Sequence, residues 1–275
     1  MTKIVGVIGN PIEHSMSPAM HNAAFLKMGV DFVYLAFRVT DLKGAVKGMR
    51  ALGIRGYNVT IPFKVDVMKH LDEVDPLACK IGAVNTVVND GGVLTGYNTD
   101  CSGAVSALEG KIRLKGKKVM VLGAGGAARA VAFGVADKGA DVVVVNRSPQ
   151  KGMELTEDVN QYFKGRANFV PFDGLADGVM DDFDVLVNTT SVGMYPDVSK
   201  SPVKKGILKK GLVVMDVVYN PIETRLLSDA KSVGCVTIKG IEMFVNQGAL
   251  AFELFIGKKA PKDVMRDAVL KMLPV

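Results

Sequence analysis

The chain has 275 residues, of which 48% are hydrophobic and 23% are charged, and this suits a globular protein with two domains of ordinary size. The first residues form too short an apolar run for a signal peptide, and no later segment approaches a membrane span, so we expect a cytoplasmic protein without a membrane partner. The net charge of +6 would suit a nucleic-acid-binding protein, but the lysines fall in expected loops without interleaved aromatic residues; we therefore expect an anionic substrate and cofactor and no nucleic acid.

Strand-like and helix-like runs alternate over the first hundred residues, which is the rhythm of an α/β domain. Strands are expected at residues 4–8, 33–39, 56–60, 83–88 and 93–97, and helices at residues 18–28, 42–52 and 63–71. The turn Asn89-Asp90-Gly91-Gly92 predicts a hairpin between the last two strands, because glycine and short polar residues suit tight turns. The sequence therefore predicts a mixed sheet in this half of the chain.

Four polar clusters lie at loops or strand ends of this domain, and we expect each to follow a strand: residues 14–18, 58–64, 85–86 and 98–100. Ligands of open α/β sheets bind beyond the carboxyl ends of strands, so the clusters predict one polar pocket. Structural roles are the alternative, since Ser15 and Ser17 could cap the helix that begins at Pro18, and Asp100 could cap the next one. Lys64 fits such a role less well, because the first turn of a helix is unfavourable for a cation.

The second half of the chain predicts a doubly wound parallel sheet. After a helix at residues 100–108, strands are expected at residues 118–122, 141–145, 169–171, 185–188, 213–218 and 236–238, with helices between most of them. Two closing helices, 242–256 and 262–273, have no strand to follow, so we expect them to return to the first domain. This predicts a catalytic substrate domain of residues 1–101 plus 239–275 and a cofactor domain of residues 102–238, with the substrate in a cleft between them.

A glycine-rich turn, Gly123-Ala124-Gly125-Gly126-Ala127-Ala128, separates the first strand of this second domain from a helix. Glycines let the backbone approach a diphosphate, and the amide groups at the start of the following helix favour negative charge. The turn alone is a weak signal, but it stands at the spacing expected before a ribose contact. The next strand ends in Asn146-Arg147 rather than in an acidic residue, which favours the 2′-phosphate of NADP over NAD.

Taken together, these segments resemble the shikimate dehydrogenase family over nearly the whole chain. The matching stretches are residues 9–18, 58–64, 82–86, 96–100, 123–128, 146–147, 188–194, 218–221 and 240–247. The resemblance implies NADP-linked interconversion of 3-dehydroshikimate and shikimate, a step toward chorismate and the aromatic amino acids. It also implies that Lys64 and Asp100 are the catalytic pair, although the sequence does not assign the transferred proton to one of them.

The family match further implies which residues bind the substrate. Hydroxyl groups of Ser15, Ser17 and Tyr219 would donate to the substrate carboxylate, and Thr60, Asn85 and Gln247 would hold its ring hydroxyls, because such groups can both donate and accept hydrogen bonds. Asn58 belongs to the same expected set.

The cofactor contacts that the match implies are Gly123, Ala124, Gly125, Gly126, Ala127, Asn146, Arg147, Ser148, Lys151, Thr189, Val217, Gly240 and Met243. Some of these residues could have a structural role instead of a cofactor contact: Met243 could pack within its helix, Lys151 could be a solvated lysine, and residues 188–194 could form a polar turn.

The scattered cysteines and histidines suggest neither disulfides nor a metal site. Three alternatives stay open: a quinate/shikimate dehydrogenase of the same family, a non-catalytic NADP-binding regulator that retained the fold, and a module related to a fused pathway enzyme. For the assembly we expect a monomer or a homodimer.

Overall fold

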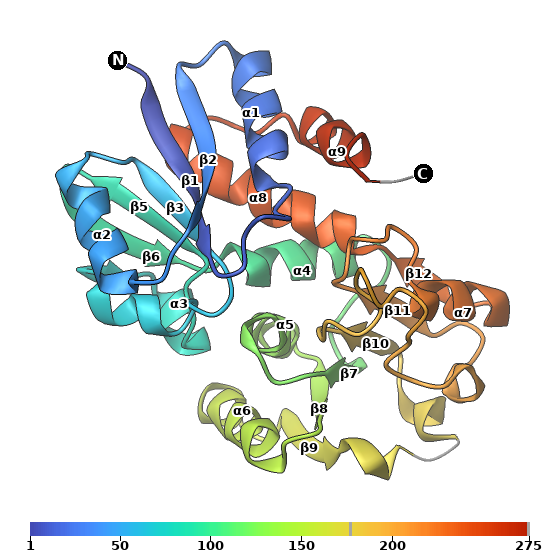
Figure 1. The fold of residues 1–275 in the computed structure, drawn as a ribbon. Helices are drawn as coiled ribbons and strands as arrows, with labels where there is room; N and C mark the ends of the chain where they lie inside the picture. Colours follow the sequence, from blue (N-terminus) through green and yellow to red (C-terminus); the bar gives the residue numbers. More distant parts are fainter. Residues whose placement is uncertain (176–177, 274–275) are drawn as a thin grey trace. The chain divides into compact units, whose positions relative to one another are not determined.

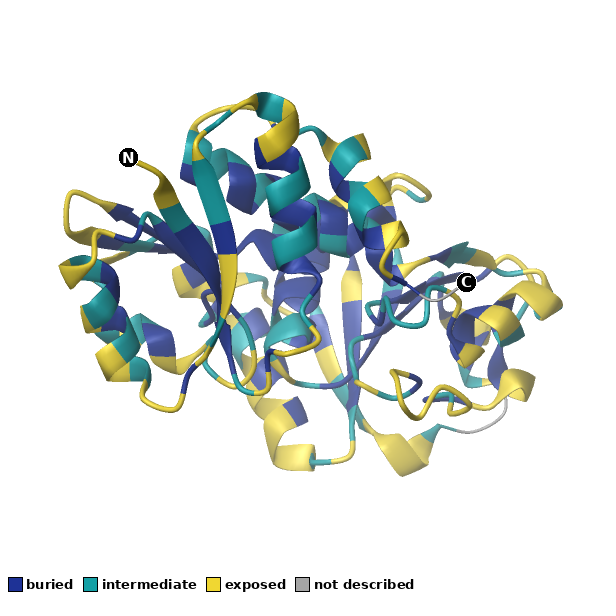
Figure 2. Ribbon diagram, turned by 45° about the horizontal axis from the view of Figure 1, so that its top comes forward, coloured by how far each residue is buried: buried dark blue, intermediate teal, exposed yellow. Residues whose placement is uncertain are grey.

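A computed structural model describes residues 1–175 and 178–273 of the chain (Figure 1). It divides into two compact units, one formed by residues 1–99 together with residues from 245 onward, and the other by residues 100–244. In both units most residues of the central strands are buried, whereas the helices have exposed outer faces (Figure 2). Each unit therefore has a core between its own sheet and helices.

The first unit contains a mixed sheet, as expected; it has six strands in the order β2-β1-β3-β5-β6-β4. Its strands are β1 (Lys3–Gly9), β2 (Phe32–Arg38), β3 (Gly56–Val59), β4 (Glu73–Val74), β5 (Thr86–Asp90) and β6 (Val93–Tyr97). Strands β1, β2 and β3 run parallel, and β5 is antiparallel to both β3 and β6. The expected hairpin is present, since β5 and β6 pair in antiparallel fashion. Gly91 and Gly92 form its turn and both adopt positive φ angles.

The helices of this unit are α1 (Ser17–Met28), α2 (Leu42–Ala51) and α3 (Pro76–Ile81). Local chemistry sets their ends: Asp41 accepts a hydrogen bond from the Gly44 amide at the start of α2, and Gly29 ends α1 in the left-handed conformation. The short elements β4 and α3 were not predicted from the sequence.

The helix predicted at residues 63–71 is wrong. Only a 3₁₀ helix, η1 (Asp66–His70), forms there. The Lys64 carbonyl, which an α-helix would use, instead accepts a hydrogen bond of 2.8 Å from the Val84 amide. The same contact helps to explain why the strand expected from residue 83 starts only at Thr86, since the residues before it bridge to the Lys64 segment.

The second unit contains an all-parallel sheet with the order β12-β11-β10-β7-β8-β9, which is the doubly wound topology predicted from the sequence. Its strands are β7 (Lys118–Leu122), β8 (Asp141–Asn146), β9 (Ala167–Pro171), β10 (Val185–Asn188), β11 (Val213–Asp216) and β12 (Val236–Ile238). Strand β11 ends at Asp216 instead of residue 218, because the Asp216 side chain accepts from the Val218 amide and turns the chain.

The helices α4 (Thr99–Glu109), α5 (Gly126–Asp137), α6 (Pro149–Tyr162) and α7 (Arg225–Val233) accompany this sheet. Shorter 3₁₀ turns, η2 (Phe172–Gly174), η3 (Val179–Asp182) and η4 (Lys205–Ile207), occupy the connections around β10.

The closing helices are α8 (Gly240–Ile256) and α9 (Lys262–Leu270), and their contacts with α1 confirm the expected return to the first unit. At Gly248 of α8 an added Cβ atom would lie 2.2 Å from the Met20 side chain of α1, so the two helices pack closely. Arg55 donates hydrogen bonds to the carbonyls of Leu254 and Phe255, and it thereby ties the end of α8 to the start of β3.

Candidate active site

The polar segments of the first unit meet at one edge of its sheet. Strands β1, β3 and β6 run in the same direction, so residues 10–18, residue 60 onward and residues 98–100 all follow their carboxyl ends at this edge. Asn85 corrects the expectation that every cluster follows a strand, since it precedes β5. Because β5 is antiparallel to its neighbours, its amino end lies at the same edge, where Thr86 pairs with Asn58.

A buried hydrogen-bond network fixes these side chains. The Asn58 Nδ2 atom donates to Thr86 Oγ1 at 2.9 Å and to the Asn85 carbonyl at 3.3 Å. Asn85 in turn donates to Thr99 Oγ1 at 3.0 Å and accepts from the Thr99 amide at 2.7 Å. Since all four residues are buried, their polar atoms are held in place before a ligand arrives.

Neither serine occupies the N-cap position of helix α1. The residue at that position is Met16, and its side chain makes no capping hydrogen bond. Ser17 is buried in the first turn, and its amide donates to the Ser15 hydroxyl at 3.4 Å. Both hydroxyls thus sit at the edge where the network lies.

The segment that precedes β5 forms hydrogen bonds with the backbone of Lys64 and with Thr99, the residue before Asp100. Lys64 is half-buried, and its carbonyl accepts from Val84. Asp100 is 6% exposed and follows Thr99, which is bonded to Asn85. It lies inside the first turn of α4 and not before it, so the N-cap alternative does not hold.

The glycine turn follows β7 at the point where the strand order of the second sheet reverses between β7 and β10. Gly123 has a φ angle of +110°, and a Cβ atom there would lie 2.7 Å from the Thr189 hydroxyl. Gly125 precedes helix α5 at an ordinary φ of −87°, and no described atom lies within 4 Å of a Cβ placed on it. No described side chain caps the first amides of α5, so these amides can bind an anion.

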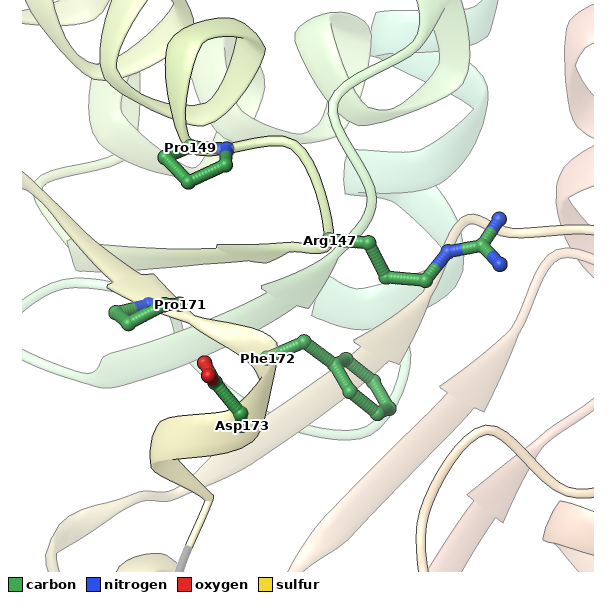
Figure 3. A pocket seen from close by; sticks show the side chains of 5 residues that line it. All are labelled: Arg147, Pro149, Pro171, Phe172 and Asp173. Carbon is green, nitrogen blue, oxygen red and sulfur yellow. The ribbon is translucent and has the colours of Figure 1, made fainter.

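A cavity of about 340 Å³ opens at the carboxyl ends of β8 and β9. Figure 3 shows its lining residues, which are Arg147, Pro149, Pro171, Phe172 and Asp173. Arg147 is exposed and its side chain extends away from Pro149. Phe172 and Asp173 were missed in the sequence, although their position one strand along from Arg147 at the same sheet edge was a usable signal.

The carboxyl ends of β10 and β11 are joined by a buried carboxylate that the sequence analysis also missed. Asp216 is 0% exposed and accepts hydrogen bonds from Asn188 Nδ2 at 2.9 Å, the Val218 amide at 3.0 Å and the Thr224 hydroxyl at 2.6 Å. Burial raises the pKa of Asp216 to about 6, and the hydrogen bonds oppose this rise. The carboxylate holds the segments that contain Thr189 and Val217.

The remaining expected contacts lie on α8 or just after β11. A Cβ atom at Gly240 would lie 2.4 Å from the Val218 carbonyl, so the start of α8 packs against the segment after β11. Met243 is buried and Gln247 is half-buried. The half-buried ring of Tyr219 stacks on Phe244 with a centroid distance of 4.4 Å, and burial raises the pKa of Tyr219.

Within residues 1–175 and 178–273, no three His, Cys, Asp or Glu side chains group as metal ligands, and no helix is long and apolar enough to cross a membrane.

Family models match almost the entire chain. Residues 7–87 match the shikimate dehydrogenase substrate binding domain, residues 105–238 match shikimate/quinate 5-dehydrogenase, and residues 240–270 match the shikimate 5′-dehydrogenase C-terminal domain.

Individual relatives are similar over their full length. The shikimate dehydrogenase (NADP⁺) of Methanocaldococcus jannaschii is 46% identical over 98% of this chain and 96% of its own. A crystal structure of a shikimate dehydrogenase in complex with NADP⁺ is 44% identical, covers 100% of this chain and 96% of its own, and has a TM-score of 0.95. The Thermus thermophilus enzyme in complex with NADP(H) and shikimate is 39% identical, covers 99% and 100% of the two chains, and has a TM-score of 0.89.

Proposed function

The chain belongs to the shikimate dehydrogenase family, and we propose that its two units divide the work of the reaction, the first binding the substrate and the second the cofactor. The reaction is the NADP-dependent, reversible reduction of 3-dehydroshikimate to shikimate in aromatic amino acid biosynthesis. The domain boundaries predicted from the sequence, residues 1–101 plus 239–275 and residues 102–238, are part of this proposal.

The observation that best supports the substrate site is the buried network around Asn58 and Asn85 at one sheet edge. A polyol requires groups that donate and accept in fixed directions, and amides held by neighbouring hydroxyls provide them. We assign Asn58, Thr60, Asn85 and Gln247 to the ring hydroxyls. The hydroxyls of Ser15, Ser17 and Tyr219 are assigned to the carboxylate, because three hydrogen-bond donors offset its desolvation.

The catalytic assignment places Lys64 and Asp100 at the reacting oxygen. The bound nicotinamide supplies or accepts the hydride. During reduction, the Lys64 ammonium stabilises the negative charge that develops on the carbonyl oxygen and donates a hydrogen bond to it. In the reverse direction, the Asp100 carboxylate accepts the proton of the substrate hydroxyl while it orients the lysine. We leave the transferred proton assigned to the pair as a whole.

The second unit has features suited to both ends of the NADP molecule. The open space in front of Gly125 and the uncapped amides of α5 suit the diphosphate. Arg147 beside the cavity at β8 and β9 suits the 2′-phosphate, with Asn146, Ser148 and Lys151 nearby in the chain. Thr189, Val217, Gly240 and Met243 are assigned to the nicotinamide end.

An assay of NADPH formation with shikimate as substrate tests the proposal. Shikimate should be oxidised with NADP⁺ far more efficiently than with NAD⁺, and more efficiently than quinate. Faster oxidation of quinate would favour the alternative substrate of the family, and the absence of any oxidation would favour a regulator. Cytoplasmic location and a monomeric or homodimeric state stay predictions.

A further inference from the structure

Tyr34 is a buried tyrosine of the first unit that the site described above does not use. It is the third residue of β2, and its side chain is 0% exposed. Its backbone is fixed to helix α1, because Asn22 accepts from the Tyr34 amide at 2.8 Å and donates to the Tyr34 carbonyl at 2.9 Å. Tyr34 is therefore anchored to helix α1 through its backbone.

The ring of His21 stacks flat on the ring of Tyr34, with centroids 4.3 Å apart and an interplanar angle of 9°. His21 is completely buried, and neither of its ring nitrogens has a hydrogen-bond partner among the residues described by the structure. Burial lowers the pKa of His21 to about 3, so the ring is neutral at physiological pH. The histidine thus acts as an uncharged stacking surface that fixes the tyrosine ring without engaging its hydroxyl.

The hydroxyl of Tyr34 contacts a residue assigned to the substrate. It donates its single proton to Asn58 Oδ1 at 2.7 Å. Burial raises the pKa of this hydroxyl, and an interaction with the Ser17 side chain opposes the rise.

We propose that Tyr34 is a positioning residue for the substrate, because its hydroxyl holds the side-chain amide of Asn58 in the orientation in which it binds shikimate. The proposal rests on the assignment of Asn58 to substrate binding. With its Oδ1 atom accepting from Tyr34, Asn58 directs its Nδ2 atom toward Thr86 and Asn85. Without the tyrosine hydroxyl, Asn58 Oδ1 loses this donor and the orientation of the amide is no longer fixed from that side.

The substitution Tyr34→Phe removes the hydroxyl and keeps the stacked ring. We expect the KM for shikimate to rise about threefold to tenfold, the range for one lost hydrogen bond, while the KM for NADP⁺ stays within about twofold of wild type. Tyr57→Phe is the matched control. Tyr57 is also buried and lies next to Asn58 on β3, but its side chain points to the opposite sheet face, and its hydroxyl bonds to no described residue. A folded Tyr34→Phe with wild-type KM for shikimate, or with an equal rise in both KM values, would overturn the proposal.

A second pair of variants tests the stack independently, should Tyr34→Phe fail to fold. His21→Leu removes the flat partner of the tyrosine, whereas His21→Phe retains an aromatic ring. We expect only His21→Leu to raise the KM for shikimate, and equal KM values in the two variants would contradict the role of the stack.

Asn58→Ala separates this inference from the proposed function. If Asn58→Ala leaves the KM for shikimate unchanged, the substrate assignment of Asn58 itself is wrong. If Asn58→Ala raises it and Tyr34→Phe does not, only the role of Tyr34 is wrong. If both raise it, Tyr34→Phe should add less in the Asn58→Ala background than in the wild type, because its effect passes through Asn58.

Discussion

The Thr224 hydroxyl donates a hydrogen bond of 2.6 Å to Oδ2 of Asp216, a carboxylate that is completely buried at the end of strand β11. The Asn188 side chain and the Val218 amide donate to its other oxygen. One acidic group thereby links the ends of two parallel strands to the start of helix α7. Three donors compensate part of the desolvation of the charge, yet burial still dominates its titration.

The raised pKa of Asp216 predicts a specific pH dependence of stability. Its folded value is about 6 and its ordinary value is 3.8, so between these values the folded state binds more protons than the unfolded state. The contribution of this group to the free energy of unfolding is therefore complete below about pH 4 and decreases as the pH rises through 6. Asp216→Asn cannot titrate, so its stability relative to wild type should improve by about 1 kcal/mol between about pH 5 and about pH 8. Urea unfolding of both proteins at the two pH values measures this, and an unchanged difference would contradict it.

Two glycines of the turn after β7 should respond differently to alanine. Gly123 has a positive φ and lacks room for a Cβ atom beside Thr189, so Gly123→Ala should destabilise the protein by about 1–3 kcal/mol. Gly125 has an ordinary φ and open space around the position of a Cβ atom. The free energy of unfolding of Gly125→Ala should therefore lie within about 0.5 kcal/mol of the wild-type value. Its methyl group would nevertheless meet the diphosphate, and we expect the KM for NADPH to rise at least about tenfold. Denaturant unfolding and cofactor kinetics of the pair test both statements; normal cofactor kinetics in Gly125→Ala would place the diphosphate elsewhere.

Local patterns predicted the two sheets well because alternation, glycine turns and apolar runs are properties of neighbouring residues. The hairpin at Gly91 and Gly92 and the termini of β7 are examples. The segment at residues 63–71 failed for the opposite reason. Its apolar spacing suits a helix, but a hydrogen bond between Val84 and Lys64, distant in sequence, decides its conformation.

The candidate site shows the same division. Ser17, Asn58 and Asn85 were predicted as site residues because polar residues at strand ends stand out in the sequence. Tyr34 was not predicted as a site residue, because an aromatic residue in a strand is usually part of the core. Only the structure shows its hydroxyl beside Asn58. Asp216 similarly looked like an interior residue of the strand expected at residues 213–218, since nothing in the sequence indicates that Thr224 and Asn188 point toward it.

Arg147 should determine the preference for NADP. Its guanidinium is exposed at the mouth of the cavity formed with Phe172, where it can pair with a phosphate in a bidentate manner. Arg147→Ala should raise the KM for NADPH by at least about tenfold and change the KM for NADH little, because NADH has no 2′-phosphate. Steady-state kinetics with both cofactors measure the effect. Lys204→Ala, which removes an exposed cation of the same unit, is the control, and equal changes with both cofactors would exclude the phosphate role.

Lys64 should be required for the chemical step and not for cofactor binding. Its segment is attached to Val84 near the Asn85 network, and a lysine ammonium there can stabilise the alkoxide that forms during reduction. Lys64→Ala should lower kcat by about two orders of magnitude or more, the usual contribution of a positioned acid or base, with the KM for NADPH within about twofold of wild type. Lys69→Ala is the matched control, because Lys69 lies five residues away on η1, is exposed, and pairs at the surface with Asp66, so that its loss should leave kcat unchanged. A folded Lys64→Ala with near-normal kcat would require another group, in the first place Asp100, to supply the proton without the lysine.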